Sequence, residues 1–339
     1  MSDALLTIIV PTYNRASSLE LLLRTLHAEI AIDAPVHVLV SDNASTDETA
    51  AVVARMCATW PALLTQRHDR NIGPDGNFCS CVERVDTRYF WIIGDDDLPK
   101  RGVVAQVVAQ LRAREPALLY MQSEWINPVL NADQGEPVGD LLVATLDSQR
   151  FAEAVHVWVT FISGMVIDKQ RLRLALGAHT ISRFDATHLV QLGWVLPLLT
   201  STGPFLFVSD RCLLATKDNT GGYGLLTVFG VNFTRVVNDS FGATHPLARA
   251  LVDGNMTQYL PGLIWSARAA SAPTTHLTES PWPALHGQLG SRWLYWMLLV
   301  PLGRFPRWLA QPFFQTWRVL NRLRREWRQR FGAAVTGAT

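Results

Sequence analysis

Three neighbouring aspartates, Asp95, Asp96 and Asp97, directly follow an apolar run at residues 89–93. Three carboxylates cannot all ionise at low cost in one dry site, so a positive partner should neutralise them, and a hard divalent cation bound through oxygen is the natural one. Residues one and three of such a loop point the same way, so Asp95 and Asp97 would share Mg²⁺ or Mn²⁺, which can bridge to a diphosphate. A solvated acidic turn, or a helix N-cap before residues 98–99, uses the same residues. The loop by itself leaves both interpretations open.

Two more polar loops follow apolar runs near the N-terminus. Residues 11–15 (Pro-Thr-Tyr-Asn-Arg) come after the first run, and residues 41–47 (Ser-Asp-Asn-Ala-Ser-Thr-Asp) come after the second. Helix capping accounts for part of the second loop, where Ser45 stands three residues before Glu48 as in a capping box. Asp42 is least explained by capping, because a carboxylate at a strand end can accept hydrogen bonds from a base or a ribose.

A further polar loop lies at Asn71-Ile-Gly73, with Arg67 and Arg70 just before it. Those arginines either pair with a diphosphate or are simply solvated.

The elements that position these loops alternate between strands and helices. Apolar, β-branched runs predict strands at residues 5–10, 36–40, 63–66 and 89–93, and helical spacing predicts helices at 17–27, from 45 onward and at 77–85. Such alternation makes a mainly parallel sheet flanked by helices, an α/β fold. Ligands of these sheets bind at the carboxyl ends of the strands, where the three polar clusters converge.

The second half of the chain has a less regular pattern. Residues 155–167 read as a buried strand pair or a strand and turn, and residues 271–283, rich in Ser, Thr and Pro, read as a linker. The run 189–208 is long enough for a membrane span, but its internal Pro, Gly and polar residues favour a buried helix followed by a strand.

Composition narrows the class of protein. The chain has 339 residues, 48% of them hydrophobic and 17% charged, which excludes a disordered chain and predicts a globular protein. Its four cysteines form no CxxC pair, so neither a disulfide framework nor a zinc site is expected. The N-terminus has neither a basic region nor a long apolar core, so we expect no signal peptide and a cytoplasmic protein.

The positive charge is concentrated near the C-terminus. Residues 304–330 contain eight arginines and one acid, a local charge of +7, whereas the rest of the chain carries −6. This distribution argues against a nucleic-acid-binding body. Aromatic residues interleave the arginines, which is typical of an amphipathic helix lying on an anionic membrane surface. A helix packed on the catalytic domain, or an oligomer contact, is the alternative.

Four motifs resemble those of family 2 glycosyltransferases, the nucleotide-sugar-dependent enzymes of the GT-A (Rossmann-like) fold. They are Val10-Pro-Thr-Tyr-Asn14, Asp42 to Asp47, Asn71-Ile-Gly73 and the DxD at Asp95 to Asp97, in the family's order and spacing over about residues 5 to 125. The resemblance implies a nucleotide-diphosphate sugar as donor and Mg²⁺ or Mn²⁺ held by Asp95 and Asp97. The donor-binding residues it implies are Pro11, Thr12, Tyr13, Asn14, Asp42, Asn43, Asn71, Asp95 and Asp96.

The acceptor side of the resemblance is weaker. The family usually has a catalytic Glu-Asp pair at a helix start, and no such pair occurs in the second half of this chain. The nearest counterpart is residues 182–188, which makes Asp185 or His188 the candidate general base. Otherwise Asp185 is an N-cap and His188 a helix-face residue.

Two further sequence features bear on the reaction. The QxxRW motif of processive synthases is absent, because Gln288 and Trp293 enclose one residue too many, so transfer of one sugar per encounter is expected. Residues 161–164 (Phe-Ile-Ser-Gly), after the three aspartates, resemble the abequosyltransferase-type subgroup of O-antigen assembly enzymes. That implies a deoxysugar donor, an inverting hexosyl or deoxyhexosyl transfer, and a polyprenyl-linked saccharide acceptor at the cytoplasmic face of the inner membrane.

These expectations divide the chain into three parts. Residues 1–125 form the nucleotide-sugar-binding half of the GT-A domain, residues 126–270 the acceptor-binding half, and residues 271–339 a helical, amphipathic, membrane-associating extension. A nucleotidyltransferase is a rival, but it would carry a Gly-rich, basic phosphate loop after the first strand, which residues 11–14 lack. A non-catalytic glycosyltransferase-like scaffold is the other rival.

Overall fold

The computed structural model describes residues 4–31, 34–126, 137–217, 223–269 and 282–335, with the side chains of the last helix described through residue 323. The chain forms two compact units. Unit 1 comprises Met1–Phe151 and Val159–Asn219, and unit 2 comprises Ala152–Trp158 and Thr220–Thr339. The functional division at residues 125 and 270 stays a prediction.

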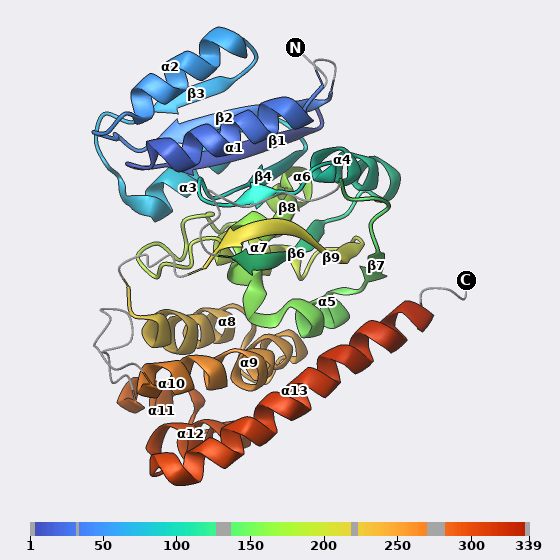
Figure 1. Cartoon of the computed structure of the whole chain (residues 1–339). Coiled ribbons are helices and arrows are strands. Elements are labelled where there is room, and N and C mark those ends of the chain that lie inside the picture. Colours follow the sequence, from blue (N-terminus) through green and yellow to red (C-terminus); the bar gives the residue numbers. More distant parts are fainter. Residues whose placement is uncertain (1–3, 32–33, 127–136, 218–222, 270–281, 336–339) are drawn as a thin grey trace. The chain divides into compact units, whose positions relative to one another are not determined.

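Unit 1 is built on a nine-stranded sheet whose first part is parallel (Figure 1). Its order begins β3 (Leu64–Arg67), β2 (Val36–Asp42), β1 (Leu6–Thr12) and β4 (Tyr89–Ile92), joined by α1 (Ala16–Glu29), α2 (Thr49–Thr59) and α3 (Gly73–Arg84). All three pairings among these strands are parallel, which confirms the predicted β–α units. Thr12 lies opposite Asp42, and Asp42 opposite Arg67, so the carboxyl ends of three strands are level with one another.

The rest of the sheet is mixed. It continues through β8 (Met165–Asp168), β6 (Leu118–Ile126), β9 (Phe205–Thr216) and β5 (Leu98–Pro99), with β7 (Val143–Leu146) beside β9. β8 runs antiparallel to both β4 and β6, whereas β6 and β9 are parallel. The helices of this part are α4 (Val103–Arg114), α5 (Ser148–Val155), α6 (Lys169–Leu176) and α7 (Leu192–Leu198).

The predicted strand pair at residues 155–167 is wrong. The segment consists of the end of α5, two 3₁₀ turns at His156–Thr160 and Ile162–Gly164, and β8 alone. His156 has φ 42°, which takes the backbone out of the helix without entering a strand. The run 189–208 does form a buried helix and then the start of a strand, α7 and β9, as predicted.

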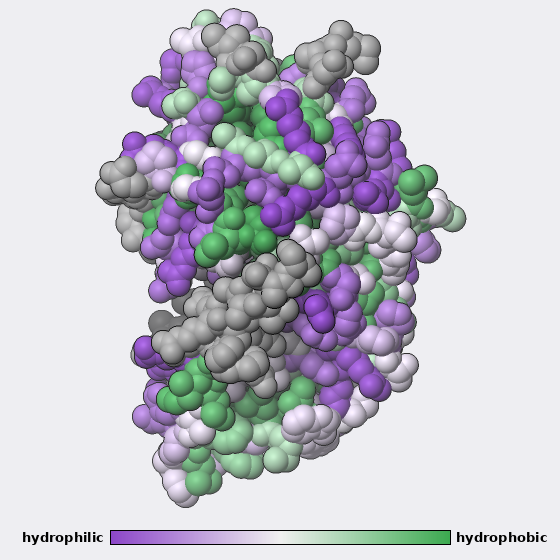
Figure 2. Space-filling model, turned by 90° about the vertical axis from the view of Figure 1, so that its right-hand side faces the viewer, coloured by the Kyte–Doolittle hydropathy of each residue, from purple (hydrophilic) through white to green (hydrophobic). Residues whose placement is uncertain are grey.

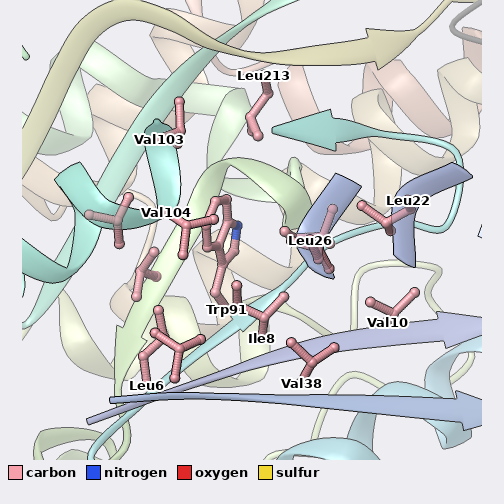
Figure 3. Packing of buried hydrophobic residues seen from close by; sticks show 14 of the residues in the cluster. Leu6, Ile8, Val10, Leu22, Leu26, Val38, Trp91, Val103, Val104 and Leu213 are labelled. Carbon is pink, nitrogen blue, oxygen red and sulfur yellow. The ribbon is translucent and has the colours of Figure 1, made fainter. Parts of the chain in front are cut away.

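Alternating apolar residues of the central strands make the main core of unit 1. Leu6, Ile8 and Val10 of β1 are fully buried on one face of the sheet, and the fully buried Trp91 of β4 lies next to them (Figure 3). Burying such side chains contributes roughly 1.5–3 kcal/mol each. Leucines of α1 and valines of α4 pack against this face, so the strand ends that bear the polar loops have rigid support.

Unit 2 is helical in its described part. Its elements are η4 (Leu226–Asn232), α8 (Phe233–Phe241), α9 (Pro246–Gln258), α10 (Leu260–Ala269), α11 (Trp282–Leu289), η5 (Tyr295–Leu299), α12 (Val300–Arg304) and α13 (Arg307–Val335). Among the described residues, no helix has the length and apolar character needed to cross a bilayer. Most of the predicted linker at residues 271–283 lies outside the described residues, and α11 begins at Trp282.

Candidate functional site

The loop after β4 places its first aspartate against the end of β1. Asp95 is buried, and Thr12 Oγ1 donates a hydrogen bond to its Oδ2 at 2.7 Å. Arg15 Nη1 lies 3.1 Å from Asp95 Oδ1 and 2.8 Å from Asp96 Oδ2, so one guanidinium pairs with two carboxylates. The parallel pairing of β1 with β4 brings these side chains together.

Asp97 contacts a different set of partners from Asp95. Its Oδ2 accepts a hydrogen bond from Ser163 Oγ at 2.6 Å, and its Oδ1 accepts one from the backbone N–H of Thr216 at 3.1 Å. Asp95 and Asp97 therefore share no protein partner, and the cation site that they would form together stays a prediction. The backbone N–H of Asp97 donates to the carbonyl of Gly94 at 3.0 Å, which closes a turn, and the side-chain alternation of an extended strand does not apply within a turn.

Burial favours the neutral form of two of the three aspartates. Burial raises the pKa of Asp95 to about 6. Burial, with the charge of Asp96, raises the pKa of Asp97 to about 7. The Asp97 carboxylate accepts hydrogen bonds from the neutral donors Ser163 and Thr216, and Arg15 is shared between the other two carboxylates. Buried oxygen ligands of this kind fit a hard divalent cation.

The protein side chains alone do not complete a metal site. No three His, Cys, Asp or Glu side chains within the described ranges converge on one metal position. A cation held by Asp95 and Asp97 would therefore need further oxygen ligands, such as those of a diphosphate.

The loops after β1 and β2 are bonded to each other. The Asn14 N–H donates to Ser45 Oγ at 2.9 Å, and the Thr46 N–H donates to Asn14 Oδ1 at 2.7 Å. Asn14 and Ala44 adopt left-handed backbone conformations, with φ of 53° and 61°. Each costs a non-glycine residue about 1–2 kcal/mol, and such conformations gather where surrounding contacts impose them at functional sites. Tyr13, between the strand end and Asn14, is 43% exposed, whereas Pro11 is buried in β1.

The predicted capping box of Ser45 and Glu48 is wrong. α2 begins at Thr49, and Asp47 Oδ1 accepts a hydrogen bond from the Thr49 N–H at 3.0 Å. Asp47 Oδ2 also accepts one from the Ala16 N–H at 3.1 Å, so this carboxylate binds the first turns of both α1 and α2. The Ser45 hydroxyl accepts the hydrogen bond from the Asn14 N–H instead, so it does not cap α2.

Asp42 is held by an arginine of the next strand. Its Oδ2 lies 2.5 Å from Arg67 Nη1, and its Oδ1 accepts a hydrogen bond from the Ser45 N–H at 2.8 Å. Arg67 also donates to the carbonyl of Ser45 at 2.7 Å. Arg67 thus forms an ion pair with Asp42 while about half of its side chain stays exposed, and a contact with a diphosphate stays a prediction.

Asn43 connects the end of β2 to the polar loop at Asn71–Gly73. Its Nδ2 donates to Asn71 Oδ1 at 3.0 Å and to the carbonyl of Gly73 at 3.1 Å, and its Oδ1 accepts from the Ile72 N–H at 3.0 Å. Asn43 is buried. Its amide therefore fixes the loop that carries Asn71.

The two candidate bases lie in an exposed turn. Asp185 and His188 are both exposed, and α7 begins only at Leu192. The helix predicted in the run 189–208 begins three residues late, at Leu192, so Asp185 is not its N-cap. Ala186 and His188 have φ of 60° and 59°, which is incompatible with a helix over this stretch.

This turn lies at the start of α3. Asp75, in the first turn of that helix, accepts hydrogen bonds from the backbone N–H groups of Ala186 and His188, and burial raises its pKa. α3 begins directly after the Asn71 loop, so the fold brings Asp185 and His188 to the same edge of the sheet as Asn71.

Two residues that contact the aspartate loop, Ser163 and Thr216, were not predicted from the sequence. Ser163 is fully buried, and its Oγ accepts a hydrogen bond from the Gly94 N–H at 2.9 Å while donating to Asp97. Residues 161–164 were noted in the sequence, yet no pattern linked them to Asp97. Thr216 bonds to the aspartate loop across 119 positions, and its Oγ1 also donates to the carbonyl of Asp96 at 2.6 Å. No local signal marks such a contact.

Comparison with known proteins covers the part of the chain that holds most of these loops. Residues 7–137 match the family described as glycosyl transferase family 2. Abequosyltransferase RfbV of Salmonella typhimurium is 36% identical over 122 residues, which are 35% of this chain and 36% of that protein, so the match spans about a third of the relative.

Solved structures extend the likeness in fold to nearly the whole chain. S. aureus TarS 1-349 has a TM-score of 0.59 and 13% sequence identity, over 95% of this chain and 91% of that one. The same protein in complex with UDP-GlcNAc has a TM-score of 0.58 over the same shares at 13% identity. This likeness confirms the predicted α/β fold, with a mixed sheet. The match to glycosyl transferase family 2 covers residues 7–137, which contain the polar ends of β1 to β4.

Proposed function

We propose that this protein transfers one sugar from a nucleotide-diphosphate sugar to a saccharide acceptor in cell-surface polysaccharide (O-antigen) synthesis. The observation that carries the proposal is the loop of three aspartates, two of them buried, beside the bonded polar ends of β1 and β2. The family match and the likeness to an abequosyltransferase support it and favour a deoxyhexose as the sugar.

The donor nucleotide would bind at the carboxyl ends of β1 and β2. Exposed Tyr13 offers an aromatic face for the base, and carboxylate and amide oxygens near it offer acceptors for base and ribose. In this proposal the nucleotide-binding residues are Pro11, Thr12, Tyr13, Asn14, Asp42, Asn43, Asn71, Asp95 and Asp96. Asn43 and Asp42 act by positioning, since their side chains hold the Asn71 loop and Arg67.

Asp95 and Asp97 would hold Mg²⁺ or Mn²⁺ together with diphosphate oxygens. The bound cation supplies a Lewis acid that stabilises the negative charge of the departing nucleoside diphosphate. Arg15, already paired with Asp95 and Asp96, adds a fixed positive charge at the same loop.

In the reaction, the acceptor hydroxyl oxygen attacks the anomeric carbon of the sugar. The bond from that carbon to the diphosphate oxygen breaks, and its electron pair leaves with the nucleoside diphosphate. The hydroxyl proton passes to Asp185 or His188, the titratable side chains of the turn beside α3. Attack from the face opposite the leaving group inverts the anomeric centre.

The acceptor in this proposal is a polyprenyl-linked saccharide at the cytoplasmic face of the inner membrane. Residues 126–270 would bind it, and residues 271–339 would meet the membrane surface. The basic charge of residues 304–330 supports this arrangement.

The test is a panel of UDP-, dTDP-, CDP- and GDP-sugars, each with and without Mn²⁺, measured by thermal unfolding. A ligand that binds the native state raises its stability by mass action, by about 2.7 kcal/mol at one hundred times its Kd. We expect a Mn²⁺-dependent shift with one nucleotide class, absent in Asp95→Ala. Release of nucleoside diphosphate from that donor upon acceptor addition then identifies transfer.

Other outcomes separate the rival functions. Release of pyrophosphate from a nucleoside triphosphate and a sugar phosphate identifies a nucleotidyltransferase. Failure of every donor to shift the unfolding temperature contradicts the proposal and favours a scaffold.

A further inference from the structure

The helix α13 packs on unit 2 through one narrow face. Phe314 stacks on Trp265 with ring centroids 4.6 Å apart, and Trp317 Nε1 donates to the carbonyl of Thr257 at 2.8 Å. The inward side chains are Ala310, Phe314, Trp317 and Asn321, spaced four, three and four residues apart. Phe314 and Trp317 therefore serve packing within unit 2 and are not available to a membrane.

A second face of α13 is apolar and uncovered by the described residues. Figure 2 shows hydrophobic side chains gathered at the lower end of the molecule, where Figure 1 places α12 and the start of α13. At about 100° per residue, the side chains of this face fall within an arc of about 140°. We call it the outward stripe: Trp308 (72% exposed), Leu309 (45%), Phe313 (38%), Val319 (57%), Leu320 (60%) and Leu323 (55%).

The third face of α13 is positively charged. Arg307, Arg318 and Arg322 are exposed and follow one another along the helix between the inward face and the outward stripe. Residues 307–323 contain no Asp or Glu. An exposed apolar stripe, on a helix held to the rest of unit 2 by another face and with exposed arginines between those two faces, is the arrangement of a helix that lies in a lipid interface.

We propose that the outward stripe of α13 lies in the interface of an anionic lipid bilayer, with the helix axis parallel to the membrane plane. The stripe would enter the boundary between headgroups and acyl chains, and the arginine row would meet lipid phosphates. Exposed Trp293, Met297 and Phe305 give unit 2 further apolar surface before this helix.

The proposal is tested by sedimentation of the full-length protein with vesicles of phosphatidylcholine alone or with 30% phosphatidylglycerol. We expect binding to the anionic vesicles, weakened by 0.5 M NaCl because salt screens the arginines. The double variant Trp308→Gln/Leu320→Gln should bind roughly tenfold or more weakly, since it removes the two most exposed apolar side chains of the stripe. Arg307→Gln/Arg318→Gln should bind roughly thirtyfold more weakly, at about 1 kcal/mol per arginine.

Matched controls distinguish vesicle binding through the outward stripe from nonspecific binding through other exposed residues. Leu174 is 85% exposed on α6, and Arg112 and Arg173 are exposed in unit 1. Leu174→Gln and Arg112→Gln/Arg173→Gln should bind vesicles as the unchanged protein does, and thermal unfolding checks that all variants are folded.

Three results would overturn the proposal: no binding of the unchanged protein to anionic vesicles, equal loss in the controls, or a dimer in solution that Trp308→Gln/Leu320→Gln dissociates. The last would assign the stripe to a second copy. Vesicle binding needs no sugar donor, so a negative result here would contradict the membrane proposal without contradicting the proposed transfer reaction.

Discussion

Asp97 is a buried carboxylate whose charge would serve cation binding in the proposed function, at a cost in stability. Burial raises its pKa from 3.8 to about 7, so the native state binds its proton more tightly than the unfolded chain does. The stability this group contributes is complete below pH 3.8 and is lost as the pH rises to about 7. Ionised Asp97 thus destabilises the ligand-free protein at neutral pH.

We expect Asp97→Asn to be more stable than the unchanged protein at pH 8 without divalent cation, by about 1–4 kcal/mol at 1.36 kcal/mol per pKa unit. At pH 4 the difference should nearly vanish. Urea unfolding between pH 4 and 8 measures it, with exposed Asp140→Asn as control. A difference that does not change with pH would contradict the burial argument. Sugar transfer should fall steeply in Asp97→Asn at every pH.

Ser163 connects the aspartate loop to the core. Its Oγ bonds both Gly94 and Asp97, and its carbonyl accepts a hydrogen bond from Trp91 Nε1 at 2.7 Å. We expect Ser163→Ala to lower the free energy of unfolding by about 1–3 kcal/mol, because it removes the hydroxyl that bonds the partly buried Gly94 N–H and the buried Asp97 carboxylate. Donor affinity in the presence of Mn²⁺, measured by calorimetry, should fall as well. Unchanged affinity alongside lowered stability would mean that Ser163 serves the fold alone.

The start of α3 belongs to the site, and a buried lysine holds its other end. Lys169 follows β8, is 6% exposed, and donates through Nζ to the carbonyls of Val82 (2.6 Å), Glu83 (3.2 Å) and Val85. These carbonyls end the helix, where an ammonium group also interacts favourably with the helix dipole.

We expect Lys169→Met to lower the free energy of unfolding by about 2–4 kcal/mol, since three carbonyls lose their donor in a buried place. Equilibrium urea unfolding measures the loss, and exposed Lys217→Met should change it by less than about 0.5 kcal/mol. Equal losses in the two variants would show that the contacts of Lys169 add nothing beyond an ordinary surface lysine.

Elements with strong local patterns were predicted well. The runs at residues 36–40 and 89–93 are strands, and 17–27 is the centre of a helix, because apolar periodicity reports directly on the buried face. The run 155–167 has no such period, and its buried residues serve two 3₁₀ turns and a strand. Apolar content shows there only that the segment is buried.

Unit 1 as a whole should respond to the donor, while unit 2 should not in the absence of lipid. With the donor and Mn²⁺ bound, we expect slower amide hydrogen exchange at residues 12–16, 42–47, 71–76 and 94–97, the loops at the carboxyl edge of the sheet. Exchange in α9 should stay the same. Mass spectrometry of peptides follows both regions, and protection confined to unit 2 would place the donor site elsewhere.

The sequence by itself determined the α/β class, the positions of β1 to β4, and the three polar loops at their ends, because these depend on local periodicity and on parallel strands ending at one edge. Only the tertiary structure decided which partner each polar side chain has. Asp42 pairs with Arg67, Asp97 with Ser163 and Thr216, and residues 185–188 reach α3. The antiparallel insertion of β8 between β4 and β6 brings Ser163 to Asp97, and the pairing of β5 with β9 brings Thr216 there. Pairing between strands distant in the chain leaves no periodic trace in the sequence.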